Sequence, residues 1–248
     1  MSTAADSNVG LTIFAGRFGS GKTEAAISFA LAQARQSEPS VMLIDLDVVT
    51  PYFRSREATE ALRRRGVEVI APAAIGQHLD TPAITPEIRG AIEQPDRPTV
   101  LDVGGDRQGA RALGGFSHAI AQRGYRMHFV VNPYRPFTDT LAGLAKSIAE
   151  IENSARLKVT SLVSNPNLMD ETTAQQIVDG HARVERFAQE LGVPVALVCL
   201  TRRWAELLGP NHFSQPTLLL DRFLIHPWET PSPSHGEGRS EGGEKERP

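Results

Sequence analysis

The chain has 248 residues, of which 40% are hydrophobic and 22% charged, a composition typical of a folded protein with a buried core. Its 26 basic and 29 acidic residues give a net charge of −3, which excludes a strong global field for holding nucleic acid or an anionic membrane. The single cysteine, Cys199, excludes an internal disulfide and cannot by itself hold a zinc ion or an iron–sulfur cluster. Because apolar runs are short and residues 1–8 lack the features of a signal peptide, we expect a cytoplasmic protein.

Short β-branched runs alternate along the chain with longer segments of helical period, which is the pattern of a parallel sheet covered by helices. Several runs are apolar at consecutive positions, as expected for strands buried on both faces. We therefore predict an α/β fold of three layers, a doubly wound and mostly parallel sheet, in a single domain. The expected strands are 9–15, 41–45, 67–70, 99–103, 126–131, 159–164 and 193–200, and the expected helices are 22–36, 56–65, 86–92, 110–123, 138–153 and 173–191.

This domain is expected to span residues 9–228, between a flexible N-terminus at 1–8 and a disordered tail at 229–248. The tail contains Pro, Ser, Gly and Glu but no large apolar residue. Such a composition cannot repay the entropy that ordering the chain would cost.

Residues 16–23, Gly-Arg-Phe-Gly-Ser-Gly-Lys-Thr, match the P-loop pattern G-x-x-x-x-G-K-[ST] and lie between an apolar strand and an Ala-rich helical run. The glycines allow backbone N–H groups to turn around phosphate oxygens at the start of a helix. Lys22 is expected to reach the β- and γ-phosphates as a catalytic residue, and Thr23 is expected to bind Mg²⁺. The residues predicted to bind nucleotide in this loop are Gly16, Arg17, Gly19, Ser20, Gly21, Lys22 and Thr23.

Two acidic segments end predicted strands. Asp102, in Val-Leu-Asp-Val-Gly-Gly-Asp, is expected to hold Mg²⁺ through water, while Gly105 lets a backbone N–H approach the γ-phosphate. Asp47 is expected to position the attacking water, and Asp45 to support the metal shell, because ligands of such sheets lie outside the carboxyl ends of the strands. The alternative interpretation of either segment is a polar turn after a strand.

Together the three motifs resemble those of the SIMIBI class of P-loop NTPases, specifically the CobQ/CobB/MinD/ParA nucleotide-binding family, over about residues 9–200. The resemblance implies that Asp102 is the Walker B acid and Asp47 the acid that positions water. It also implies a nucleotide-sandwich dimer, in which a signature lysine reaches the partner's phosphates. Arg17 stands at the position of that lysine, and Phe18 replaces the glycine that follows it. Asn165 matches the family's base-binding asparagine, so the resemblance assigns it to nucleotide binding.

We therefore expect a Mg²⁺-dependent ATP-binding protein, a slow ATPase that acts as a conformational or dimer switch on an unknown client protein. The guanine motif N-K-x-D is not present in register, but the spacing of Asn167 and Asp170 leaves GTP open, and ATP is favoured. Neither nucleic acid nor a membrane is expected as a partner.

Two other functions stay open. One is an ATP-dependent ligase similar to dethiobiotin synthetase or cobyrinic acid amide synthase, and the other is a nucleotide-binding scaffold without hydrolysis. In the loop 132–137, Tyr134 or Arg135 is expected either to touch nucleotide or partner or to serve ordinary loop packing. In a ligase, the candidate carboxylate clamps would be Arg54, Arg107, Arg111 and Arg135.

Overall fold

The structure is a computed structural model that describes residues 10–36, 40–46, 56–70, 86–94, 96–105 and 107–221. Its strands form one sheet in the order β3-β2-β4-β1-β5-β6-β7-β8, and all neighbouring strands pair in parallel. The predicted α/β architecture is confirmed. The strands are β1 (Leu11–Ala15), β2 (Val41–Leu46), β3 (Val67–Ile70), β4 (Thr99–Val103), β5 (Arg126–Val131), β6 (Ser161–Ser164), β7 (Val195–Thr201) and β8 (Thr217–Leu220).

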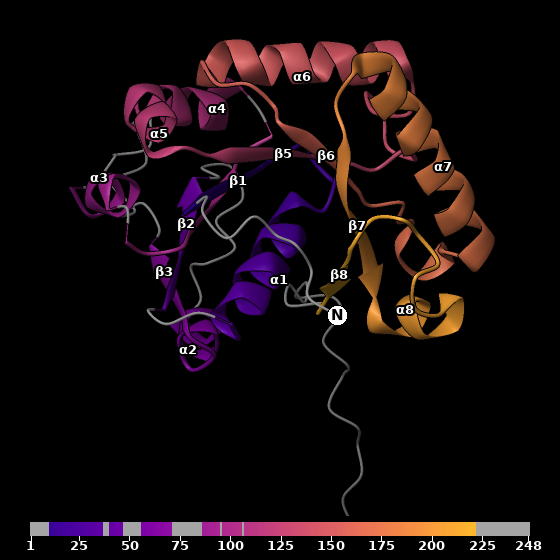
Figure 1. Cartoon of the computed structure of the whole chain (residues 1–248), viewed down its shortest axis with the longest axis horizontal. Coiled ribbons are helices and arrows are strands. Elements are labelled where there is room, and N and C mark those ends of the chain that lie inside the picture. Colours follow the sequence, from indigo (N-terminus) through magenta and orange to yellow (C-terminus); the bar gives the residue numbers. More distant parts are fainter. Residues whose placement is uncertain are drawn as a thin grey trace, which may run out of the picture.

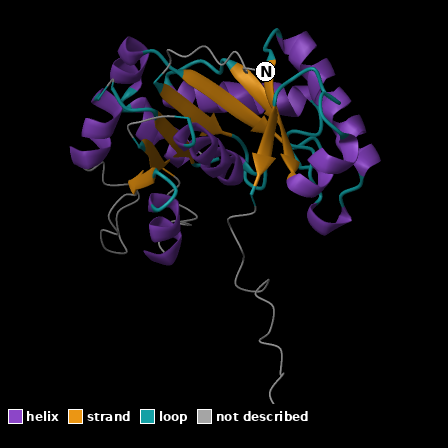
Figure 2. Cartoon of the chain, turned by 60° about the horizontal axis from the view of Figure 1, so that its bottom comes forward, coloured by secondary structure: helices purple, strands orange, loops and turns teal. Residues whose placement is uncertain are grey.

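Helices cover both faces of this sheet (Figures 1 and 2). Successive side chains of a strand face opposite sides, so Ile13 contributes to one core and Phe14 to the other. Figure 1 shows α4, α5 and α6 on one side of the strands and α1 and α2 on the other. The helices are α1 (Lys22–Ala34), α2 (Arg56–Arg63), α3 (Pro86–Glu93), α4 (Arg107–Gly114), α5 (Ser117–Arg123), α6 (Leu141–Ala155), α7 (Ala174–Leu191) and α8 (Arg202–Leu208).

Two predicted helices differ from the structure, and two short elements were not predicted. The helix expected at 110–123 is two helices, α4 and α5, because the Gly114-Gly115 pair interrupts it and Gly114 lies tightly against Ser154 O of α6. The helix expected from Thr138 begins at Leu141, after Thr140 caps it by accepting a hydrogen bond from Gly143 N. The elements α8 and β8 were not predicted, and both are short, with seven and four residues.

Cys199 is buried in β7, and burial raises the pKa of its thiol to about 12. Its place is that of a small hydrophobic residue in the core. None of the helices in the described ranges combines the length and apolar character needed to cross a bilayer.

His128 of β5 makes the stability of the fold depend on pH. Its Nδ1 lies 2.6 Å from Ser161 Oγ, and its ring packs against the rings of Phe14 and Phe29. Burial, assisted by the charge of Arg126, lowers the pKa of His128 from 6.5 to about 4. The folded state therefore favours the neutral ring, whereas the unfolded chain takes up a proton below pH 6.5.

On account of this residue, we expect the free energy of unfolding to decrease by about 3 kcal/mol as the pH falls from 6.5 to 4. Urea denaturation at several pH values, for the wild type and for His128→Gln, measures the difference. Glutamine keeps a polar partner for Ser161 but does not titrate, so the slope of stability against pH should be smaller in the variant. Equal slopes for the two proteins would show that His128 does not carry this pH dependence.

Candidate functional site

The predicted P-loop connects the carboxyl end of β1 to the first turn of α1. Ser20 N donates to Arg17 O at 3.0 Å, and Ala25 N donates to Gly21 O at 3.0 Å as the helix begins. Gly21 has a φ of +83°, and a Cβ there would collide with Asn165 Nδ2, so only glycine fits. The sequence motif thus forms a tight turn at a helix N-terminus, where backbone N–H groups can receive an anion.

Lys22, Thr23 and Asp102 lie together at this turn. Lys22 Nζ is 3.9 Å from Asp102 Oδ1 and 3.4 Å from Thr23 Oγ1. All three are buried, with exposed fractions of 7%, 6% and 1%. The structure therefore brings together the lysine and the metal-side residues that the sequence predicts.

Asp45 joins this group from the neighbouring strand. It is the register partner of Asp102 in the parallel pair β2–β4, so both carboxylates leave the sheet on the same face. Asp45 is also buried. Two carboxylates and the Thr23 hydroxyl are oxygen donors of the kind that Mg²⁺ prefers.

This donor set fits Mg²⁺ only in company with a phosphate ligand. Within the described ranges, no group of three or more His, Cys, Asp or Glu side chains could hold a metal ion. Mg²⁺ is usually held by one or two carboxylates together with water and substrate phosphates. Thr23, Asp45 and Asp102 are thus the residues that would hold it beside a bound nucleotide.

Gly105, in the turn after β4, lies directly on the P-loop. A Cβ at this position would lie 2.5 Å from Gly16 O and 2.9 Å from Phe18 N. Only a residue without a side chain can bring the backbone so close. The turn after β4 and the P-loop therefore form one continuous surface, as the predicted role of Gly105 requires.

Asn165, directly after β6, holds the P-loop through a side-chain hydrogen bond. Its Nδ2 donates to Ser20 O at 2.7 Å, and its side chain is buried. The amide nitrogen is therefore used to hold the loop. The neighbouring Asn167 closes its own turn, since its Oδ1 accepts from Met169 N at 2.6 Å.

Arg17 points away from the P-loop toward α6. Its Nη1 lies 3.2 Å from Glu150 Oε2, and its guanidinium lies 4.9 Å from the centre of the Phe137 ring. Phe18 and Phe137 are 78% and 63% exposed, so the mouth of the P-loop carries two exposed aromatic rings. Sequence reasoning missed Glu150, because nothing in a regular helix marks one acid as the partner of a distant arginine.

The sequence also left the role of the loop between β5 and α6 undecided. Tyr134 packs against α7, where its hydroxyl donates to Gln176 O at 2.5 Å and Arg183 lies over its ring. Arg135 instead lies beside Gly19 of the P-loop. The two prolines around this turn were the available signal that it is rigid.

Several predicted residues cannot be placed in this site. Asp47 and Arg54 lie outside the described residues. Arg107 begins α4, but its side chain is not described, and Arg111 is exposed on the same helix.

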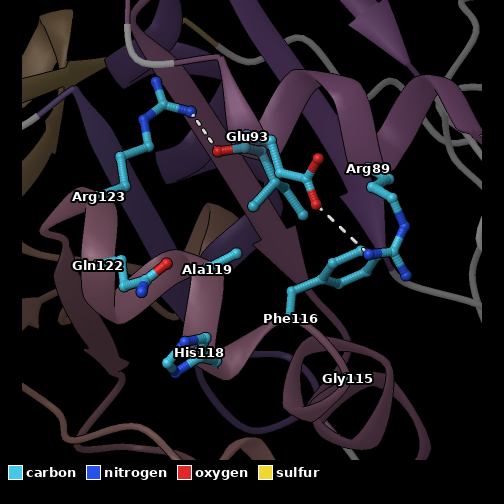
Figure 3. Close-up of a pocket in the computed structure, with 9 residues that line it drawn as sticks. Arg89, Glu93, Gly115, Phe116, His118, Ala119, Gln122 and Arg123 are labelled. Carbon is cyan, nitrogen blue, oxygen red and sulfur yellow. Dashed lines mark hydrogen bonds and ion pairs between the residues drawn. The ribbon is translucent and has the colours of Figure 1, made fainter.

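A separate groove of about 550 Å³ lies between α3 and α5 (Figure 3). Arg89 pairs there with Glu93 at 3.3 Å and lies over the Phe116 ring. Arg123 donates to the carbonyls of Ile92 and Gly10, the second of which precedes β1. The groove is therefore at the amino ends of the strands, at the opposite edge from the P-loop, and its arginines are engaged in holding helices.

A scan against protein-family models and a search of curated proteins find no match. Solved structures do match. The cell division protein FtsY from Thermotoga maritima aligns at 18% identity and a TM-score of 0.50 over 77% of this chain, and chloroplast FtsY from Physcomitrella patens aligns at 19% and 0.50 over 76%. This chain covers 61% and 57% of those two chains, about three fifths of their length. A nucleotide-binding protein from Archaeoglobus fulgidus, in complex with ADP, is 16% identical at a TM-score of 0.45, over 82% of this chain and 90% of its own.

The likeness to the FtsY structures is one of fold. It extends over about three quarters of the chain. The chain therefore has an α/β, P-loop NTPase-like fold.

Proposed function

We propose that this protein binds a nucleoside triphosphate with Mg²⁺ at the P-loop and hydrolyses it slowly, with ATP favoured over GTP. The observation that carries the proposal is the buried group of Lys22, Thr23 and Asp102 at the start of α1. A buried lysine beside a helix N-terminus is a site for phosphate, and the neighbouring oxygen donors suit its metal ion.

Each residue of the site has a separate role in this proposal. Lys22 and the backbone N–H groups of the P-loop bind phosphate oxygens and stabilise the charge that develops on them. Thr23 and Asp102, with Asp45 beside them, hold the metal ion, which when bound polarises the phosphate oxygens. Gly105 brings the turn after β4 against the loop, so that a change at the phosphates can move this turn.

Asp47 is proposed as the residue that orients the attacking water. Asp47→Ala should leave the affinity for Mg-ATP within about threefold and slow single-turnover hydrolysis about 100-fold, the size of effect expected from a lost general base. Glu190→Ala, which removes an exposed acid from α7, is the matched control and should change neither quantity. A loss of binding in Asp47→Ala would give this residue a structural role instead.

The proposed switch is a nucleotide-dependent association of two copies of the chain through the P-loop face. The exposed rings of Phe18 and Phe137 support it, because association would bury them. Light scattering on Asp47→Ala, with bound nucleotide measured alongside, should show the mass double with Mg-ATP but not with Mg-GTP or without nucleotide. A constant mass with nucleotide bound would contradict the dimer, and small carboxylate substrates of a ligase would then be assayed.

A further inference from the structure

Arg135 lies beside the P-loop of its own chain, although it belongs to the loop between β5 and α6. A Cβ on Gly19 would be 3.6 Å from Arg135 Nε and 3.8 Å from Arg135 Cζ. The flat guanidinium therefore lies against the middle of the P-loop, whose backbone N–H groups are those expected to face phosphate. Its side chain is exposed, so a ligand can reach it.

The loop that carries Arg135 is fixed by its own hydrogen bonds. Arg135 N donates to Asn132 O at 3.1 Å, and Thr138 N donates to Arg135 O at 3.2 Å. The Thr138 hydroxyl donates to Asn132 O at 2.7 Å, and Arg183 donates to Pro133 O at 3.1 Å. The backbone that carries Arg135 is therefore held near the P-loop before any ligand binds, which reduces the entropy cost of a contact.

The charge of Arg135 has no acidic partner in the described part of the chain. No described carboxylate lies within ion-pair distance of its guanidinium, whereas Arg17 is paired with Glu150 at 3.2 Å. Of these two arginines of the P-loop face, Arg135 is the one whose donors are available to an anion. A guanidinium can bind two phosphate oxygens at once through parallel N–H groups.

We propose that Arg135 is a phosphate-binding residue of this site, a second cation that acts in the same chain alongside Lys22. The inference rests on the proposed function, since it takes the P-loop to be the phosphate site. The loop between β5 and α6 would then bind ligand directly, instead of serving only to pack against its neighbours.

The test uses inorganic tripolyphosphate and Mg-ATP as probes, titrated calorimetrically into the full chain. Arg135→Ala should weaken the binding of both about tenfold, and Arg135→Lys should recover part of the loss because it keeps the charge. Arg186→Ala, which removes another exposed arginine from α7, is the matched control and should bind as the wild type does.

Unchanged affinities in Arg135→Ala would overturn the inference. So would a loss confined to Mg-ATP, because that would place Arg135 at the base or ribose. Lys22→Ala distinguishes a failure of the role of Arg135 from a failure of the proposed phosphate site. If it abolishes binding while Arg135→Ala has no effect, only the role of Arg135 fails, and if Lys22→Ala binds as the wild type does, the proposed phosphate site itself fails.

Discussion

Replacement of Lys22 by alanine is expected to weaken nucleotide binding about 100-fold, or about 3 kcal/mol, the upper range for a hydrogen bond to a charged group. The side chain is only 7% exposed, and its ammonium group lies between Asp102 and Thr23. Water therefore cannot replace it at the phosphates without entering a buried site. Anisotropy of a fluorescent ADP, titrated with wild type and variant, measures the change.

The matched control is Lys158→Ala, which removes a lysine whose side chain is 82% exposed and pairs with Glu152 at the surface. It should leave the affinity unchanged. Retained affinity in Lys22→Ala would show that nucleotide, if bound, is bound elsewhere in the chain.

Gly105→Ala is expected to reduce both nucleotide affinity and stability. The new Cβ would lie 2.5 Å from Gly16 O and 2.9 Å from Phe18 N. These are backbone atoms that cannot rotate away, so the P-loop or the turn after β4 must move. We expect a loss of about 1–3 kcal/mol in the free energy of unfolding, the usual cost of overpacking, and a displaced loop that binds nucleotide at least tenfold more weakly.

Gly90→Ala is the control for this substitution, because a Cβ on Gly90 in α3 meets nothing within 4 Å. It should stabilise the protein by up to about 1 kcal/mol, since alanine is the better helix former. Chemical denaturation and nucleotide titration of both variants give the comparison. A Gly105→Ala protein that binds nucleotide normally would show that the contact between this turn and the P-loop is not needed for the site.

The parts of the site that the sequence predicts are those defined by short-range pattern. The glycines and Lys22 are recognisable because strand, loop and helix must follow one another at fixed spacing. Asp45 and Asp102 are recognisable because parallel strands end at one edge of a sheet, and the register confirms that they are partners.

The parts that sequence could not predict depend on contacts between distant segments. Arg17 and Glu150 are 133 residues apart, and Asn165 and Ser20 are 145 apart. No local pattern selects such partners, because many exposed acids and amides would serve equally well. The same holds for Arg135, which lies beside Gly19 because β5 is the parallel neighbour of β1 and the loops after both strands leave the same edge of the sheet.

Secondary structure was missed for a different reason. The break between α4 and α5 falls at two adjacent glycines. Glycine lowers the stability of a helix only slightly, so the break also depends on the close packing of Gly114 against α6. The edge strand β8 alternates buried and exposed residues over only four positions. Such a segment is stabilised by its neighbours β7 and α1 rather than by its own propensity.

The most direct test of the central claim is a calorimetric titration of the full chain with ADP in the presence of Mg²⁺. We expect one nucleotide to bind per chain, with an affinity lowered when Mg²⁺ is removed. Saturation at one site would establish the P-loop protein as a nucleotide-binding protein and justify the search for its hydrolysis and its client. The absence of binding of ADP, ATP or GTP at millimolar concentration would contradict the account.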